Sequence, residues 1–373
     1  MLVVVALSGG VDSSVAAALL QAQGHEVVGV TMQIWPEEDA ARTERHGGCC
    51  AMGAVRDARA VAGVLGIPYY VFQMREEFER EVIARFVDAY ARGRTPNPCV
   101  ACNEFVKFRA LLAKARRMGA DALATGHYAR LRQGPDGWEL WQAADPRKDQ
   151  SYVLHPVQAE HLGYLRFPTG EMTKEETRAY ARRVGLPTAD KPDSQEICFA
   201  GEEGYAAVVG RQRPEALRPG PILDQDGRVL GQHRGLAHYT VGQRRGLGLA
   251  TGTPLFVLAL DPERNAVVVG DATDAGVDAC TVRRVNWLAA APPAGTPVLA
   301  RVRSGPAMHP ARIEADAHGG LRVRFDPPVR AVTPGQACVL YAEQRVLGGG
   351  EIDTVARTAA AGAVPITKSR RGP

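Results

Sequence analysis

The stretch from residue 2 to residue 14 has the sequence LVVVALSGGVDSS. Its apolar run, residues 2–7, fits a buried parallel strand, because such strands are covered on both faces and show no polar alternation. A helix is expected over residues 12–22, where apolar residues recur at helical spacing. In open α/β sheets, ligands bind at the turn between such a strand and such a helix. The stretch therefore predicts an α/β fold with a binding turn at residues 8–10.

The turn Ser8-Gly9-Gly10 has the chemistry of an anion site. Two glycines let the backbone curl so that successive N–H groups converge on one anion. The hydroxyls of Ser8 and Ser13 add donors, and a helix N-terminus adds partial positive charge. The spacing and the lysine of the Walker loop are absent, and so is the GxGxxG pattern. Taken alone, the glycine pair also fits a simple turn in which serine or aspartate caps the helix.

The rest of the first half alternates between strands and helices. Strands are expected at 25–32, 69–73 and 122–125, and helices at 51–65, 76–91 and 103–118. A hairpin around Pro135-Asp136-Gly137 and a helix opened by a capping box at Thr173 and Glu176 complete this half. Strands and helices in alternation form right-handed crossovers, and hence a parallel sheet with helices on both faces.

The second half of the chain has a different pattern. From about residue 220 onward, short strand-like runs are separated by turn residues, which is typical of small antiparallel β domains or barrels. We therefore predict an α/β domain with a parallel sheet, followed by two small β-rich domains, the last of them a β-barrel. The expected ranges are 1–205 for the parallel-sheet domain, 206–275 for the central β-rich domain, 276–359 for the barrel and 360–373 for a flexible tail.

Composition limits the class of protein. The chain has 373 residues, 45% of them hydrophobic and 23% charged, an ordinary globular balance that suggests two or three domains. The net charge is +4. Residues 1–200 hold 24 basic and 25 acidic side chains, whereas residues 201–373 hold 21 and 16. A nearly neutral first half and a basic second half fit an enzyme core with an appendage that holds a polyanion, although so small an excess is also common without one.

The sequence predicts neither a membrane protein nor a secreted one. No stretch of about 18 uninterrupted apolar residues occurs, and the apolar N-terminus lacks a basic leader. The cysteines number seven, and an odd count argues against a disulfide framework. We therefore expect a cytoplasmic location without a membrane partner.

Three cysteines lie in distinctive motifs. Cys99 and Cys102 belong to the string TPNPCVACN, and Cys198 belongs to DSQEICF. Cys102 is expected just before a helix, whose N-terminus lowers the pKa of a thiol and favours the reactive thiolate. A CxxC pair alone also fits a redox pair, chance or half of a zinc site. The further zinc ligands would be His46, Cys49 and Cys50.

Six strings follow one another in a fixed order: SGGVDS at 8–13, NPCVACN at 97–103, GHYAR at 126–130, KDQSY at 148–152, DSQEICF at 193–199 and YTVGQRRGLG at 239–248. Together they resemble the tRNA-specific 2-thiouridylase family, and they span about two thirds of the chain. This family belongs to the PP-loop ATP-pyrophosphatase superfamily. The resemblance implies the fold of the adenine nucleotide α-hydrolases for the first domain, and it implies an enzyme, a tRNA-uridine 2-sulfurtransferase.

The implied reaction is the ATP-dependent 2-thiolation of the wobble uridine of tRNA. ATP adenylates the C2 carbonyl oxygen, which is otherwise a poor leaving group, and persulfide sulfur then replaces it, giving 2-thiouridine, AMP and pyrophosphate. The resemblance implies that Mg²⁺ accompanies ATP near Asp12, and no structural metal is expected. The implied ATP contacts are Ala6, Leu7, Ser8, Gly9, Gly10, Val11, Asp12, Ser13, Met32 and Gly126.

The resemblance also implies roles for the cysteines and for tRNA contacts. Cys198 carries the persulfide, and Cys102 is the nucleophile that forms a transient disulfide with it. The sulfur comes from a persulfide donor, either a cysteine desulfurase or a relay protein, and the enzyme is expected to be a monomer. The implied contacts to the target base are Asn97, Pro98 and Cys99, and those to the rest of the tRNA are His127, Lys148, Asp149, Gln150, Arg303, Ser304 and Gln336.

The chain departs from the family pattern at two positions. Many members carry aspartate where this chain has Cys99, which puts a general-base role at this position in doubt. The substitution also opens an alternative, in which Cys99, Cys102 and Cys198 hold a [4Fe–4S] cluster with one iron left open for sulfide. Ser304 stands where an aromatic residue often follows the arginine, and serine cannot stack on a base.

Other interpretations fit parts of the sequence. A different PP-loop enzyme, such as an amidotransferase or an argininosuccinate-synthase-like ligase, would have no use for paired cysteines. An ATP-responsive tRNA-binding module without catalysis would not need them either. For individual residues the simpler interpretations are a satisfied helix-end histidine at His127, a solvated ion pair at Lys148 and Asp149, and an exposed turn at Arg244 and Arg245.

Overall fold

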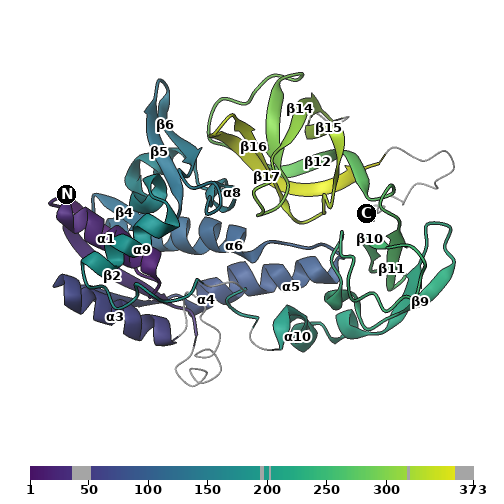
Figure 1. Ribbon diagram of the computed structural model, residues 1–373, viewed down its shortest axis with the longest axis horizontal. Helices are drawn as coiled ribbons and strands as arrows, with labels where there is room; N and C mark the ends of the chain where they lie inside the picture. The colour runs from purple at the N-terminus through teal and green to yellow at the C-terminus, as the bar shows by residue number, and fades with distance from the viewer. Residues whose placement is uncertain (36–51, 194–196, 201–202, 317–319, 358–373) are drawn as a thin grey trace.

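The computed structural model describes residues 1–35, 52–193, 197–200, 203–316 and 320–357. In this part of the chain three sheets occur, one in the first half and two formed largely by the second half (Figure 1). Some predicted features lie outside the described residues, namely His46, Cys49, Cys50, residues 194–196 of the DSQEICF string and the tail 360–373.

The first sheet is parallel and is built around the opening strand. Its strands lie in the order β3-β2-β1-β4-β7. They are β1 (Leu2–Ala6), β2 (Glu26–Gln33), β3 (Tyr69–Gln73), β4 (Ala122–Thr125) and β7 (Leu165–Arg166). The three valines of β1 are completely buried, as expected for a central strand that is covered on both faces. The predicted parallel-sheet fold is confirmed.

Helices cover both faces of this sheet. Val3 and Val5 of β1 pack with residues of α1 (Val11–Ala22) and α3 (Met52–Leu65), whereas Val4 belongs to a hydrophobic cluster on the opposite face. This division follows from strand geometry, in which successive side chains point to opposite faces. The helix α9 (Lys174–Arg183) packs on α1 and begins with the predicted capping box, in which Thr173 and Glu176 bond reciprocally.

Two long helices on the Val4 face each consist of consecutive segments. The first is formed by α4 (Arg75–Phe78), a π-helical turn η3 (Glu79–Ile83) and α5 (Ala84–Ala91). The second, here named the cysteine helix (residues 98–117), is formed by α6 (Pro98–Ala101), a π-helical stretch η4 (Cys102–Leu111) and α7 (Leu112–Arg117).

The cysteine helix begins earlier than the sequence predicts. Pro98 occupies its first position, and the Asn97 side chain caps it by accepting the N–H of Cys99 at 3.0 Å. Cys102 is therefore the fifth residue of the helix, so the prediction that it immediately precedes the helix is wrong. Cys99, in the first turn, is the thiol closest to the N-terminus of this helix.

The middle sheet is small and mixed. Its strands lie in the order β10-β11-β8-β9, and β11 pairs with β8 in parallel, unlike the all-antiparallel pattern expected from the sequence. The strands are β8 (Gly220–Leu223), β9 (Val229–His233), β10 (Phe256–Asp261) and β11 (Ala266–Gly270). Helix α10 (Gly204–Gln212) and the short 3₁₀ helices η7 (Pro214–Leu217) and η8 (Leu236–His238) connect it to the first domain.

The last sheet closes into a six-stranded antiparallel barrel, because β12 pairs with both β15 and β17. Its strands are β12 (Gly276–Trp287), β13 (Pro297–Arg301), β14 (His309–Ala315), β15 (Leu321–Arg330), β16 (Ala337–Ala342) and β17 (Arg345–Ala356). The predicted barrel is thereby confirmed. A hairpin of the first domain, β5 (Ala129–Gly134) and β6 (Gly137–Gln142), joins this sheet where Trp141 pairs with Arg345.

Short elements link the first domain to the barrel. They include α8 (Ser151–Leu154), whose Tyr152 bonds to Ala337 of β16, while η5 (Ala159–Tyr164) and η6 (Pro168–Glu171) pack within the first domain. Among the described residues, no helix has the length and apolar character needed to cross a membrane.

Candidate active site

The turn after β1, here named the glycine loop (residues 8–13), is fixed by short hydrogen bonds. Ser13 Oγ accepts the N–H of Ser8 and donates to Gly10 O, both at 3.1 Å. Gly10 is the N-cap of α1, and no side chain caps that end of the helix. The first N–H groups of α1 are thus not occupied by a serine or aspartate cap, in contrast to the simple-turn interpretation.

Two glycines of this region are required by close backbone approaches. Gly9 has a φ of +66°, and a Cβ there would lie 2.4 Å from Ala54 O. A Cβ at Gly126 would lie 2.4 Å from the backbone nitrogen of Ser13. The structure therefore brings Gly126, which follows β4, directly against the glycine loop, as the predicted ATP site requires. Met32 lies on β2, whose Val30 pairs with Ala6 of β1.

A chain of charges extends from the glycine loop. Asp12 Oδ1 accepts bonds from Lys174 Nζ at 2.6 Å and from the Tyr128 hydroxyl at 2.9 Å. Lys174, whose side chain is 8% exposed, also pairs with Asp193 Oδ1 at 2.8 Å. Lys148 Nζ lies 2.8 Å from Asp193 Oδ2. These ion pairs tie the residue that begins the DSQEICF string to the glycine loop.

The environment sets the protonation of two of these groups. Partial burial acts to raise the pKa of Asp193, but the hydrogen bonds from Lys148 and Lys174 outweigh it and lower the pKa. Burial and the neighbouring Asp12 carboxylate raise the pKa of the Tyr128 hydroxyl, which therefore remains a donor. Sequence reasoning missed Lys174 and Tyr128 as site residues. Two sequence features could have identified them. The capping box fixes Lys174 as the first residue of α9, and Tyr128 belongs to the GHYAR string.

The motif cysteines are thiols in this structure. Cys99 is exposed, whereas Cys102 and Cys198 are half-buried. Both half-buried cysteines pack against the hydrophobic cluster that contains Val4 of β1. Within the described ranges, no group of three or more histidine, cysteine or acidic side chains is arranged to hold a metal ion, so the three cysteines do not form a preassembled ligand set.

The KDQSY segment lies at a junction and does not form an exposed ion pair. Asp149 is buried and pairs with the buried Arg301 of β13, while Gln150, itself exposed, accepts the backbone N–H of Tyr128 at 2.9 Å. Arg301 in turn donates to the carbonyl oxygens of Ser304 and Gly305. Arg301 thereby shapes the turn that presents the exposed Arg303 and Ser304, which were predicted as tRNA contacts.

His127 lies in the interior. It bonds to Thr125 Oγ1 at 2.6 Å and to Lys107 Nζ at 3.4 Å, and its ring contacts Phe108 and Phe167. Burial, together with the charge of Lys107, lowers the pKa of His127 well below its usual range, so that the imidazole is neutral. Its side chain is satisfied within the protein, as in the simpler interpretation, but His127 lies between β4 and β5 and not at the end of a helix.

Known protein families and their members match almost the whole chain. Residues 1–202 match the family model described as "tRNA methyl transferase HUP domain", residues 207–271 its PRC-barrel domain and residues 277–352 the "Aminomethyltransferase beta-barrel domain". A tRNA-specific 2-thiouridylase of Methylorubrum populi is 52% identical over 94% of this chain and 93% of that protein. The chain belongs to the tRNA-specific 2-thiouridylase family. A second such relative, from Chloroflexus aurantiacus, is 51% identical over 94% of this chain and 98% of its own length.

Solved structures are more distant. A 4-thiouridine synthetase in complex with RNA and ATP is 20% identical, with a TM-score of 0.37, over 57% of this chain and 50% of that chain. Membership of the 2-thiouridylase family therefore rests on the sequence relatives, and it argues against the amidotransferase, ligase and binding-module hypotheses.

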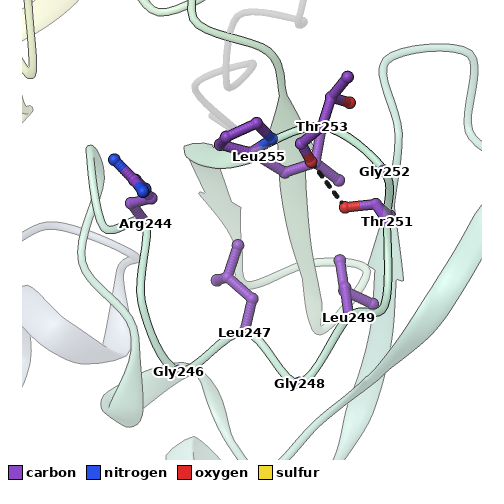
Figure 2. A pocket seen from close by; sticks show the side chains of 10 residues that line it. Arg244, Gly246, Leu247, Gly248, Leu249, Thr251, Gly252, Thr253 and Leu255 are labelled. Carbon is purple, nitrogen blue, oxygen red and sulfur yellow. Dashed lines mark hydrogen bonds between the residues drawn. The ribbon is translucent and has the colours of Figure 1, made fainter.

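The YTVGQRRGLG string of this 2-thiouridylase lies in the middle domain. It contributes Arg244, Gly246 and Leu247 to an open pocket, whose far wall includes Leu249, Thr251 and Leu255 (Figure 2). Thr251 Oγ1 donates to Thr253 O at 2.8 Å and closes that wall. The middle sheet and the helix α1 lie at opposite ends of the molecule (Figure 1), so this pocket is separate from the glycine loop.

Proposed function

We propose that this protein catalyses the ATP-dependent 2-thiolation of the wobble uridine of tRNA, giving 2-thiouridine, AMP and pyrophosphate. The observation that supports the proposal most directly is the ion-pair chain from Asp12 through Lys174 to Asp193. Cys198 follows Asp193 by five residues. At most about 3.5 Å per residue, the Cα atom of Cys198 is within about 18 Å of the Cα atom of Asp193. One site can therefore serve both the activation of the base and the delivery of sulfur.

In this proposal the glycine loop binds the phosphates of ATP. The open N–H groups at the start of α1 and the hydroxyls of Ser8 and Ser13 are donors to anionic oxygens. Asp12 is the carboxylate that would hold Mg²⁺ with ATP, while Met32 and Gly126 flank the adenosine. The remaining ATP contacts are those implied by the family resemblance: Ala6, Leu7, Gly9, Gly10 and Val11.

Sulfur delivery proceeds in two bond exchanges. The terminal sulfur of a Cys198 persulfide attacks C2 of the adenylated uridine, and AMP leaves with the former carbonyl oxygen. The Cys102 thiolate then attacks Cys198 Sγ and breaks the S–S bond, which leaves the thiocarbonyl on the base and a Cys102–Cys198 disulfide. The two thiols supply the two electrons that reduce the sulfane sulfur. An external dithiol reductant and a persulfide donor must therefore reset the enzyme for each turnover.

Transfer RNA is held by both the parallel-sheet domain and the barrel in this proposal. Asn97, Pro98 and Cys99 face the target base, and the exposed Arg303 and Ser304 contact the remainder together with Lys148 and Gln150. The buried Asp149 contributes by holding Arg301 in place. In this proposal the protein acts as a monomer. Its three domains are residues 1–205, 206–275 and 276–359.

The direct test is product formation. The protein is incubated with ATP, Mg²⁺, a persulfide donor, a dithiol reductant and unmodified tRNA, and the digested tRNA is analysed for 2-thiouridine. We expect product with the wild type and none with Cys198→Ser, because the serine variant cannot carry a persulfide. Arg182→Met, which removes an exposed arginine of α9, is the matched control and should retain activity. Absence of 2-thiouridine from the wild-type reaction would reject the function.

The same assay separates the persulfide route from the cluster alternative. Anaerobically purified protein is analysed for iron and acid-labile sulfide before the reaction. Full activity in iron-free protein supports the persulfide route. An activity that rises in proportion to bound iron, and is lost in Cys99→Ala, would replace it with a cluster on Cys99, Cys102 and Cys198.

A further inference from the structure

The loop that leads into the cysteine helix is held by the barrel. Thr95 donates its backbone N–H to Pro334 O at 3.0 Å, and Gln336 Nε2 donates to Thr95 O at 2.8 Å. Both backbone polar groups of Thr95 therefore bond across the domain boundary, and Thr95 is 6% exposed. These buried bonds stabilise the folded protein, because a backbone group left without a partner there would raise its free energy.

The barrel turn approaches this loop so closely that a side chain would not fit. Gly335 has a φ of +96°, and a Cβ there would lie 2.9 Å from the backbone nitrogen of Thr95 and 3.0 Å from Arg94 Cβ. Glycine is needed both for the backbone conformation and for the space. The contact between turn and loop is thus a specific fit and not a loose apposition.

Arg94 adds an ionic anchor to the same contact. Its guanidinium bonds to Ile352 O at 2.9 Å, to Asp353 Oδ1 at 3.0 Å and to Glu351 Oε1 at 3.1 Å, all on β17. The Arg94 side chain is 16% exposed, so water screens these pairs only in part.

The anchored position is transmitted to Cys102 by a stiff segment. Pro96 and Pro98 follow Thr95 within three residues, and each fixes its own φ and restricts the residue before it. The cysteine helix begins at Pro98 and continues through Cys102 without interruption. A shift of Thr95 is therefore passed on to the Cys102 thiol and is not absorbed by a flexible linker.

A second part of the barrel, strand β16, supports the far side of Cys102. Asn103, which is 1% exposed, donates from Nδ2 to Val153 O of α8 at 3.0 Å. Helix α8 is held in turn by β16, because the Tyr152 hydroxyl donates to Ala337 O at 3.0 Å and lies 3.1 Å from the backbone nitrogen of Ala337. Gln336 precedes that residue, and its Oε1 lies 3.4 Å from the same hydroxyl.

We propose that Gln336 is a positioning residue for the Cys102 thiol, acting through Thr95 on one side and Tyr152 on the other. The proposal rests on the proposed function, from which it takes Cys102 as the nucleophile. In this proposal the amide of Gln336 bonds to Thr95 and Tyr152 before any tRNA binds, and is not a tRNA contact. The barrel then contributes to the geometry of the reacting thiols as well as to the binding of tRNA.

The test compares two glutamines that both cross between the barrel and the first domain. Gln336→Met removes the bonds to Thr95 and Tyr152, whereas Gln344→Met removes the bond that Gln344 Oε1 accepts from Arg130 on the β5–β6 hairpin. For each variant, the rate of Cys102 alkylation by iodoacetamide is measured against pH without tRNA, by mass spectrometry of the Cys102 peptide. The dissociation constant for tRNA and the single-turnover rate of thiolation are measured in parallel.

We expect Gln336→Met to change the alkylation rate of Cys102 about threefold and to slow thiolation about tenfold, with tRNA affinity unchanged, since small misplacements of reacting groups are costly. Gln344→Met should change neither rate. Weaker tRNA binding with unchanged Cys102 reactivity would identify Gln336 as a tRNA contact and overturn the proposal. Equal effects of the two variants would also overturn it, because they would indicate general loosening of the barrel.

A second substitution guards against misfolding. Gln336→Glu keeps the size and the acceptor for Tyr152 but loses the donor to Thr95, and it should reproduce the change in Cys102 alkylation. An unchanged alkylation rate in this variant would contradict the role of the Thr95 bond. Because alkylation is measured without ATP or tRNA, its result stands apart from a failure of the wild type to thiolate tRNA, which would reject the proposed function itself.

Discussion

The glycine loop and the start of the cysteine helix are stabilised by different parts of the chain. The glycine loop is held by bonds among residues 8–14, by the close backbone approaches at Gly9 and Gly126, and by Lys174 and Lys191, which bond to Asp12 Oδ1 and Gly9 O. The start of the cysteine helix is held by the barrel, through Pro334 and Gln336, more than 230 residues along the chain. The proposed ATP-binding region is thus completed by residues of the first half of the chain, whereas the start of the helix that carries the proposed nucleophile Cys102 also depends on the barrel.

The largest effect is expected from Gly126→Ala, which places a new Cβ against the glycine loop. The new Cβ would lie 2.4 Å from Ser13 N and 2.5 Å from the carbonyl carbon of Asp12, and backbone atoms cannot move aside cheaply. Formation of AMP should fall at least about 100-fold, because the reacting groups are displaced. Release of AMP from ATP in the presence of tRNA measures this directly.

The comparison predicts that Gly126→Ala leaves the alkylation rate of Cys102 unchanged. Gly63→Ala is the matched control, because a Cβ at Gly63 of α3 meets nothing within 4 Å, and it should be neutral or slightly stabilising. If Cys102 reactivity changed along with AMP formation, the two regions would not be independent.

A smaller effect is expected from Lys174→Met, which cuts the link between the glycine loop and Asp193. The free energy of unfolding should fall by about 1–3 kcal/mol, because two partly buried carboxylates lose a charged partner. Chemical denaturation of Arg182→Met should show a change below about 0.5 kcal/mol, since that arginine forms an exposed ion pair with Asp190.

The acid dependence of Lys174→Met supplies a second measurement. The pKa of Asp193 is lowered in the folded protein, so its stabilising contribution is present above its unfolded pKa and is lost as the pH falls through the folded one. Removal of Lys174 should weaken that dependence in the acid range. A variant whose acid profile matched the wild type would show that Lys174 does not hold Asp193 charged.

The smallest effect is expected from His155→Gln. It concerns the pH dependence of the free energy of unfolding and is absent at neutral pH. Burial lowers the pKa of His155 to about 4, although its bond to Tyr152 O opposes the shift. Between about pH 6.5 and pH 4 the unfolded chain binds the extra proton, so stability falls as the pH is lowered. His155→Gln should flatten the unfolding profile in that window. Retention of the full wild-type slope would mean that other groups cause it.

The difference between the two regions also explains what could be predicted from sequence. The strand, turn and helix of residues 2–22 were predicted because their pattern is local, as were the parallel sheet and the barrel. The start of the cysteine helix was placed too late, because the cap at Asn97 and proline at Pro98 were not given weight. The bond between Gln336 and Thr95 could not be predicted, since no local pattern pairs residues so far apart.

The candidate site follows the same division. Gly126, predicted to flank the adenosine, lies against the backbone of Asp12 and Ser13, whereas His127 is an interior side chain. Lys174 was missed because its importance arises only when α9 packs on α1 and directs the ammonium toward two carboxylates. Motifs thus identified positions near the site, but folding decides which of their side chains face it.

The bonds between Thr95 and the barrel have a consequence for biosynthesis. The ribosome makes Gln336 long after Thr95, and at about 5–20 residues per second the delay is about 10–50 s. During that interval the nascent polypeptide can form its parallel sheet and its glycine loop, but the start of the cysteine helix lacks its bonding partners in the barrel. Under the proposed function, a truncated translation product that lacks the barrel would therefore not thiolate tRNA, and this activity would be acquired only when the final strands have been made.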